Sequence, residues 1–326
     1  MSTLALKGPA WVTARQYRRT LWLAGALALL ALAVVGGLRI WAAQEPLPAQ
    51  DGMWISSTDN DGYLKLRRIV EYVGGAAIVL PGLVAAVVAG PMVAREYESG
   101  TYQLSLTQSV GPVEWLRSKL TVAAAVGVLA ALAVMGIFWF GRLGVREGWD
   151  YHWGDPATYT ATGITVLAHV LAAVAVGALV GQLVRRTVPA MAVAALVTGS
   201  VLAVFNGYRW SLLSAERETF PLGSQSGLAP DHLYMDSGML TSSGAPFDPS
   251  VCWTRANATP GSDADPELWE KVEKQCYAEH DVTTQYIDYH PSSHFWPTQL
   301  IETGIVLALA ALVVFAAFRV LRARHA

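Results

Sequence analysis

The sequence predicts an all-α integral membrane protein with six transmembrane helices. Hydrophobic residues make up 53% of the 326 residues and charged residues only 15%, whereas a soluble domain carries about 25% charged residues. Six stretches reach the length of about 20 apolar residues that a helix needs to cross a bilayer, and none shows the alternation of a membrane β-barrel. The stretches are residues 20–43, 72–94, 120–141, 160–184, 188–208 and 297–319.

The first stretch follows residues 1–19, an amphipathic segment that contains Arg15, Arg18 and Arg19. It is about twice as long as the apolar core of a secretory signal, and Trp41 spoils the small-residue pattern of a cleavage site. We therefore expect an uncleaved transmembrane helix.

The distribution of Lys and Arg predicts that both termini are cytoplasmic. In this arrangement the cytoplasmic pieces carry 12 of the 23 Lys and Arg residues and three acidic residues, as the positive-inside rule requires. A basic cluster at residues 65–68 is a local exception, because this arrangement places it outside. The predicted regions are a connecting segment at 1–19, helices one to five within 20–208, an extracytoplasmic domain at 209–296, and helix six with a basic tail at 297–326.

The predicted extracytoplasmic domain is polar and contains Pro, Gly and Ser throughout, with a short helix expected at Pro266–Tyr277. Cys252 and Cys276 both lie in it, on the side of the membrane where disulfides persist. One bridge between them is the simplest expectation, and two free thiols are the alternative. Several histidines also lie here, but they lack the spacing of a metal site, so no metal ligand is predicted.

The inner segment 95–119, between the second and third stretches, is too polar to cross the membrane and alternates charges with apolar residues. Gly100 can end one helix, and Gly111 with Pro112 can break the chain and start another. Two short helices at the membrane face are therefore expected. An ordinary amphipathic loop and a helix that docks a partner remain open from these residues alone.

This segment resembles the permease subunits of type-2 ABC exporters, particularly a bacterial, actinobacterial-like group with an R-E-x-E-x-G-T…TQS…W…K pattern. A second resemblance precedes helix six, at residues 290–305. The chain departs from the pattern at residues 111–113, where the family usually has a basic residue. The matching positions in the first pattern are Arg95, Glu96, Glu98, Gly100, Thr101, Thr107, Gln108, Ser109, Trp115 and Lys119.

The resemblance implies a multi-pass subunit of the plasma membrane that exports a hydrophobic or amphipathic substrate, such as a drug, and is not itself an enzyme. It implies two copies of a partner ATPase, which hold ATP and Mg²⁺, and a second permease, either another copy in a homodimer or a similar chain in a heterodimer. The chain has no G-x-x-x-x-G-K-[ST] phosphate loop. The residues implied to couple to the ATPase are Arg95, Glu96, Glu98, Gly100, Thr101, Gln108 and Trp115, with segment 1–19 as an interfacial helix.

Four polar residues within the spans are candidates for a gate: Arg39, His169, Asn206 and Glu302. Ionisable residues in a membrane are costly and face the bundle interior or a partner. Glu302 is expected to pair with a cation, for which Arg39 is the candidate, or to be a simple interfacial anchor. For the other residues, an interhelical hydrogen bond is the alternative to a functional role.

Two other functions compete with export. The same architecture suits a sensing or immunity module that detects or expels a membrane-active peptide or drug without full translocation. An intramembrane enzyme would require a convergent set of catalytic groups, which the scattered His and Asp residues do not provide. The net charge of −2, without a long basic tract, gives no support for a nucleic-acid partner.

Overall fold

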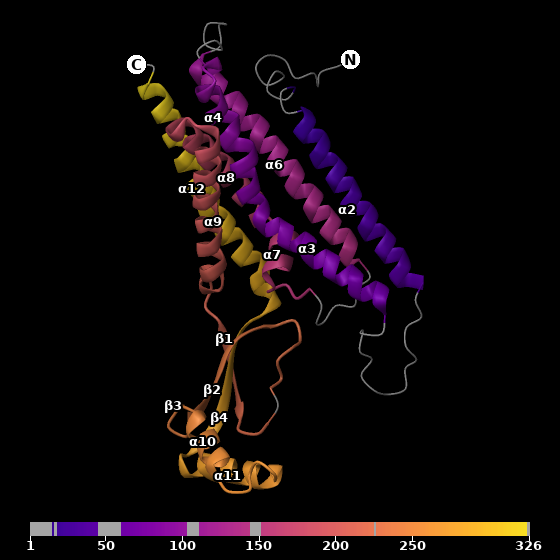
Figure 1. Ribbon diagram of the computed structural model, residues 1–326. Helices are drawn as coiled ribbons and strands as arrows, with labels where there is room; N and C mark the ends of the chain where they lie inside the picture. The colour runs from indigo at the N-terminus through magenta and orange to yellow at the C-terminus, as the bar shows by residue number, and fades with distance from the viewer. Residues whose placement is uncertain are drawn as a thin grey trace. The chain divides into compact units, whose positions relative to one another are not determined.

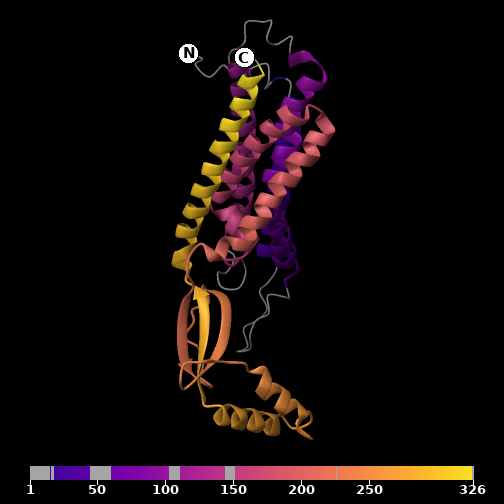
Figure 2. The ribbon, with the colours of Figure 1, turned by 90° about the vertical axis from the view of Figure 1, so that its left-hand side faces the viewer.

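A computed structural model describes residues 15, 18–44, 60–102, 111–143, 151–224 and 226–324. The chain divides into two compact units. The first unit comprises residues up to Leu212 together with those from Trp296 onward, and it is a bundle of long helices (Figure 1). The second unit, Leu213–Phe295, contains a small sheet and two helices (Figure 2).

Six helices among the described residues are long and apolar enough to cross a membrane, which confirms the predicted number. The second of them is continuous through three elements, because a π-helical stretch joins two α-helices. A short helix, α7 (Pro156–Thr162), precedes the fourth. The six are α2 (Arg18–Gln44), α3 (Asp61–Leu83) with η2 (Val84–Ala89) and α4 (Gly90–Glu98), α6 (Pro112–Arg142), α8 (Thr165–Val184), α9 (Thr187–Tyr208) and α12 (Phe295–Ala323).

Helix α3 begins well before the apolar stretch predicted from residue 72. Its first turns are amphipathic and carry ion pairs four residues apart, Asp61 with Lys65 at 3.8 Å and Arg67 with Glu71 at 3.1 Å. Such pairs support a helix without raising its hydropathy. The apolar pattern therefore located the part of the helix that suits lipid and missed its charged beginning.

The inner segment has helix boundaries where the glycines predicted them. Helix α4 ends at Glu98, and Gly100 has a φ of +71°, a conformation that favours glycine. Helix α6 starts at Pro112, directly after Gly111. The first predicted short helix is thus the end of α4 and the second is the first turns of α6, while residues 103–110 lie outside the described part of the chain.

The centre of the bundle depends on small residues that allow α8 to approach the bent helix α3–η2–α4. A Cβ atom on Gly177 would lie 2.6 Å from the Cβ of Ala89 and 2.9 Å from the backbone N of Gly90. One on Gly181 would lie 2.8 Å from the carbonyl oxygen of Gly90. These two small residues, four positions apart in α8, therefore pack directly against the neighbouring backbone.

Substituting Gly177→Val is expected to destabilise the bundle by about 1–3 kcal/mol, because the clash with the Gly90 backbone cannot be relieved by side-chain rotation. The measurement is the thermal unfolding temperature of the purified protein in detergent. The matched control is Gly199→Val in α9, where nothing lies within 4 Å of the added Cβ. Equal unfolding temperatures for the two variants would contradict the packing argument.

The second unit contains a four-stranded antiparallel sheet in the order β1-β4-β2-β3. Residues alternate between its faces, and Arg217 of β1 lies opposite Asp288 of β4, with two bonds of 2.6 and 2.7 Å between guanidinium and carboxylate. The sequence did not predict this sheet. The strands are β1 (Glu216–Pro221), β2 (Leu233–Thr241), β3 (Pro246–Phe247) and β4 (Val282–His290).

Two helices complete the second unit, α10 (Ser250–Ala258) and α11 (Pro266–Glu279). The second confirms the predicted short helix, and Asp265 caps it by accepting from the backbone N–H groups of residues 267 and 268. A disulfide between Cys252 and Cys276 joins them, with Cα atoms 5.5 Å apart, as predicted. Both cysteines are fully buried in the small core of this unit.

Candidate functional site

An aromatic cluster packs the end of α4 against the first turns of α6. The rings of Tyr97, Tyr102 and Trp115 contact one another, with centroids 4.6 to 5.9 Å apart. Leu116 and Leu321 of α12 complete the cluster. The inner segment is therefore part of a packed core that includes three long helices, and we call this end of the bundle the Glu98 end (Figure 1).

Glu96 connects α4 to α6. Its carboxylate accepts a hydrogen bond of 2.6 Å from Trp115 Nε1 and a second bond from Lys119 Nζ. The side chain of Lys119 is only 5% exposed, so its charge depends on this partner. Glu96 therefore has its partners within the chain.

Glu98 connects α4 to α9 in a similar way. Its carboxylate accepts from the backbone N–H of Thr187 at 2.8 Å and from the Thr187 hydroxyl. Thr187 is the first residue of α9, where the N–H groups of a helix have no partner in the helix itself. Glu98 thus caps α9 from a neighbouring helix.

The charged side chains exposed at the Glu98 end are mostly arginines, with the acids Glu98 and Glu114 as exceptions. Of the predicted coupling residues, Trp115 is buried, Glu96 is half-buried, and Gln108 lies outside the described residues; the exposed ones are Arg95, Glu98, Gly100 and Thr101. The contacts of Glu96 and Glu98 leave arginines as the main charged groups available to another molecule. The exposed arginines at this end are Arg95, Arg117, Arg185, Arg186, Arg319 and Arg322.

A second polar cluster is buried at the opposite end of the bundle, around Glu302 of α12. Glu302 is fully buried, and Arg209 binds both of its carboxylate oxygens at 2.8 and 3.1 Å. The hydroxyl of Tyr159 donates to Glu302 at 3.2 Å, and the Arg209 guanidinium lies 4.1 Å from the centre of the Tyr159 ring. The expectation that Glu302 pairs with a cation is confirmed.

The prediction that Arg39 is this cation was wrong, because Arg209 occupies that position. Arg39 donates to the carbonyl of Phe140, and its guanidinium lies 5.1 Å from the centre of that ring. Arg209 was missed because it follows the apolar stretch 188–208 directly, where an arginine looks like an ordinary flanking charge. A useful signal was available, since the end of α9 and the start of α12 must meet at the same face of the membrane.

Gln299 is a further buried residue that sequence reasoning missed. It occupies the break between α7 and α8 at Gly163, where an added Cβ would lie 1.9 Å from the Gln299 amide. The amide donates to the carbonyl of Tyr159 at 2.9 Å and accepts from the N–H of Thr165 at 3.0 Å. These bonds supply partners that the broken helix lacks.

His169 and Asn206 lie beside this cluster. His169 Nδ1 contacts the carbonyl of Thr165 at 2.9 Å, and its Nε2 lies 3.7 Å from a Glu302 oxygen, too far for a hydrogen bond. His169, Asn206 and Arg209 line a small cavity of about 20 Å³ between α3, α8 and α9. The fold therefore brings two predicted residues, His169 and Asn206, together with Arg209. The other predicted residue, Arg39, has separate contacts.

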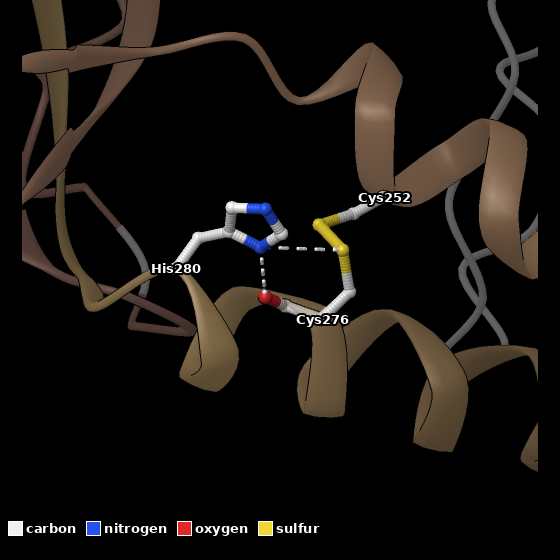
Figure 3. A group of neighbouring side chains, drawn as sticks. All are labelled: Cys252, Cys276 and His280. Atoms are coloured by element: carbon white, nitrogen blue, oxygen red, sulfur yellow. Dashed lines mark hydrogen bonds between the residues drawn. A yellow bond between two sulfur atoms is a disulfide. The ribbon is translucent and has the colours of Figure 1, made fainter.

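The second unit holds one cluster with the residue types of a metal site, among the residues that the structure describes. Cys252, Cys276 and His280 lie together (Figure 3). However, the sulfurs are bonded to each other, and a metal requires free thiolates. His280 Nδ1 instead contacts the carbonyl of Cys276 at 2.9 Å, at the end of α11. This cluster is a disulfide beside a helix-capping histidine.

Comparison with known families gives one match. Residues 48–209, close to half of the chain, match the family described as ABC-2 membrane transporter related. No curated protein matches the chain. Together with the six apolar helices, the match identifies a multi-pass protein of the plasma membrane and supports an ABC-2-type permease, which is a transport component and not itself catalytic.

Proposed function

We propose that this chain is the membrane-spanning subunit of an ATP-driven exporter for a hydrophobic or amphipathic substrate. A separate ATPase, in two copies with ATP and Mg²⁺, supplies the energy, and two permease chains form the pathway. The observation that carries the proposal is the family match, which includes the whole inner segment 95–119. Helices α2 and α9 expose most of their apolar residues, because only 6% and 17% of the most apolar stretch of each helix is buried. These exposed surfaces suit contact with lipid or with a second copy of the chain.

The proposed orientation places the Glu98 end in the cytoplasm and the second unit outside. The exposed arginines of the Glu98 end support this orientation. The disulfide between Cys252 and Cys276 also supports it, because disulfides persist outside the cytoplasm.

The contacts of the inner segment support a role as a lever. Glu96 attaches the end of α4 to α6, and Glu98 attaches it to α9. Movement of the ATPase against Gly100 and Thr101 would therefore be passed to three transmembrane helices at once. These two glutamates act within the chain, and we assign the direct ATPase contact to the exposed residues Arg95, Thr101 and Arg117.

The test is the double charge reversal Arg95→Glu with Arg117→Glu. Both side chains are exposed, so the permease should still fold, while an acidic partner surface would be repelled. We expect at least a tenfold loss of the co-purified ATPase and of ATPase activity in membranes. Removing Glu96 and Glu98 would be a poorer test, because both hold the bundle together.

The matched control is Arg68→Glu, which reverses an exposed arginine of α3 at the opposite end of the bundle. It should retain the ATPase. If the double variant also retains the ATPase, the docking assignment is wrong. If the complex forms and hydrolyses ATP but moves no substrate into inverted vesicles, the alternative of a sensing or immunity module is favoured.

A further inference from the structure

We infer that the cavity beside Glu302 is a binding subsite for the hydroxyl group of an amphiphile. Two buried polar atoms of the residues that line this cavity, His169 Nε2 and Thr165 Oγ1, have no hydrogen-bond partner among the described residues. Their residues are 5% and 0% exposed. Buried polar atoms without partners are rare and call for an occupant.

The tautomer of His169 determines what that occupant must offer. In the part of the chain that the structure describes, Nδ1 contacts the carbonyl of Thr165, which can only accept, so Nδ1 carries the hydrogen. In the neutral imidazole Nε2 is then an acceptor, and it faces the Glu302 carboxylate, another acceptor, at 3.7 Å. Two acceptors face each other with no hydrogen between them, so the site requires a hydrogen-bond donor.

The kink in α3 adds acceptor character to the cavity wall. Pro81 lines the cavity together with Ala77, four residues earlier. Because proline has no N–H, it cannot provide the helical hydrogen bond to the Ala77 carbonyl. The Thr165 hydroxyl can accept or donate. A group with one donor hydrogen and lone pairs fits this set, and a hydroxyl has both.

The size and charge of the cavity favour a neutral hydroxyl over an ammonium group. A volume of about 20 Å³ accommodates roughly one polar heavy atom. Arg209 also lines the cavity, and it already neutralises Glu302 by binding both carboxylate oxygens, so no unpaired anion is left there to hold a cation. The hydroxyl can belong to a free amphiphile or to a lipid headgroup, since both offer the same chemistry.

The residues that line the cavity indicate the route by which a hydroxyl group would enter it. Asn206 of α9 lines the cavity and is itself exposed, which favours an entrance past this residue. An amphiphile in the membrane could place its hydroxyl inside and leave its chain along the apolar wall. The apolar wall consists of Ala77, Ile78, Pro81, Val166 and Leu202.

This inference rests on the proposed function only for the identification of the amphiphile as cargo. Binding itself requires no ATPase and is measured on the full chain alone. The probe is radiolabelled 1-dodecanol with the protein in phosphatidylcholine nanodiscs, and empty nanodiscs provide the background. The competitor is 1-methoxydodecane, in which a methyl group replaces the donor hydrogen of the alcohol.

We expect the alcohol to bind about three- to tenfold more tightly than the ether, the range expected for one buried hydrogen bond. The variants Thr165→Val and His169→Leu should abolish this preference. The matched control is Thr198→Val, because Thr198 in α9 is also a buried threonine with a hydroxyl that lacks a partner, yet it does not line the cavity. This control should retain the preference.

A second arm replaces part of the phosphatidylcholine by phosphatidylglycerol, whose headgroup carries hydroxyls. Competition would assign the subsite to lipid headgroups, and no competition would assign it to free amphiphiles. Equal binding of alcohol and ether, or an equal loss in Thr198→Val, would overturn the inference. Failure here with a normal ATPase complex would leave the exporter proposal standing.

Discussion

Replacing Arg209 by methionine is expected to destabilise the helix bundle by about 3–5 kcal/mol, because Glu302 would remain buried without its cation. The loss should be much smaller in the double variant Arg209→Met with Glu302→Leu, since no isolated charge remains. The measurement is the thermal unfolding temperature and the yield of monodisperse protein in detergent for the two single variants and the double variant.

The matched control is Arg39→Met. Arg39 is also an arginine within a long helix, but its described partners are the carbonyl and ring of Phe140, so no buried acid loses its cation. A double variant as unstable as the single variant would show that the loss comes from the packing of the arginine side chain. An Arg209→Met protein as stable as the wild type would contradict the ion-pair assignment.

Replacing Cys252 and Cys276 by serine is expected to destabilise the second unit by about 3 kcal/mol, the value for a loop closed over 24 residues. The core of this unit has only a few buried side chains. Other side-chain bonds between α10 and α11 are exposed, and such exposed pairs contribute little to stability. They join Trp253 with Glu273, Arg255 with Glu279 and Trp269 with Asn257. Limited proteolysis of the full chain should then cut within residues 250–279, and mass spectrometry identifies the sites.

Reduction of the wild-type protein should produce the same cleavage sites, and the bundle should resist cleavage in both samples because it forms a separate compact unit. The single variants Cys252→Ser and Cys276→Ser should behave like the double variant. Unchanged proteolysis after loss of the bridge would show that the contacts of α11 with the sheet are sufficient without it.

The transmembrane spans were predictable because crossing a bilayer imposes a length and an apolar composition that few other structures share. The glycine boundaries of the inner segment were predictable for a local reason, since Gly100 takes a backbone conformation that other residues avoid. The disulfide was predictable because the two cysteines of the chain lie in the same polar segment, between the fifth and sixth spans.

The contacts of individual polar residues were not predictable, because they depend on how helices distant in sequence are arranged. Glu96 was predicted to contact the partner ATPase. Its contacts with Trp115 and Lys119 depend on the packing of α4 against α6, which the sequence does not show. The break between α7 and α8 was hidden because both sides of Gly163 are apolar enough to read as one span. The sheet was missed because its strands are largely polar and lie in a segment with Pro, Gly and Ser throughout.

Gln299 has a mechanical consequence for the bundle. Its amide bonds to both sides of the gap at Gly163, and Glu302, less than one turn further along α12, holds Tyr159 and Arg209. These hydrogen bonds and the ion pair attach the beginning of α12 to α7, to the first turn of α8 and to the residue that follows α9. We therefore expect these pieces to move together, without displacement relative to one another, during any conformational change at that end of the bundle.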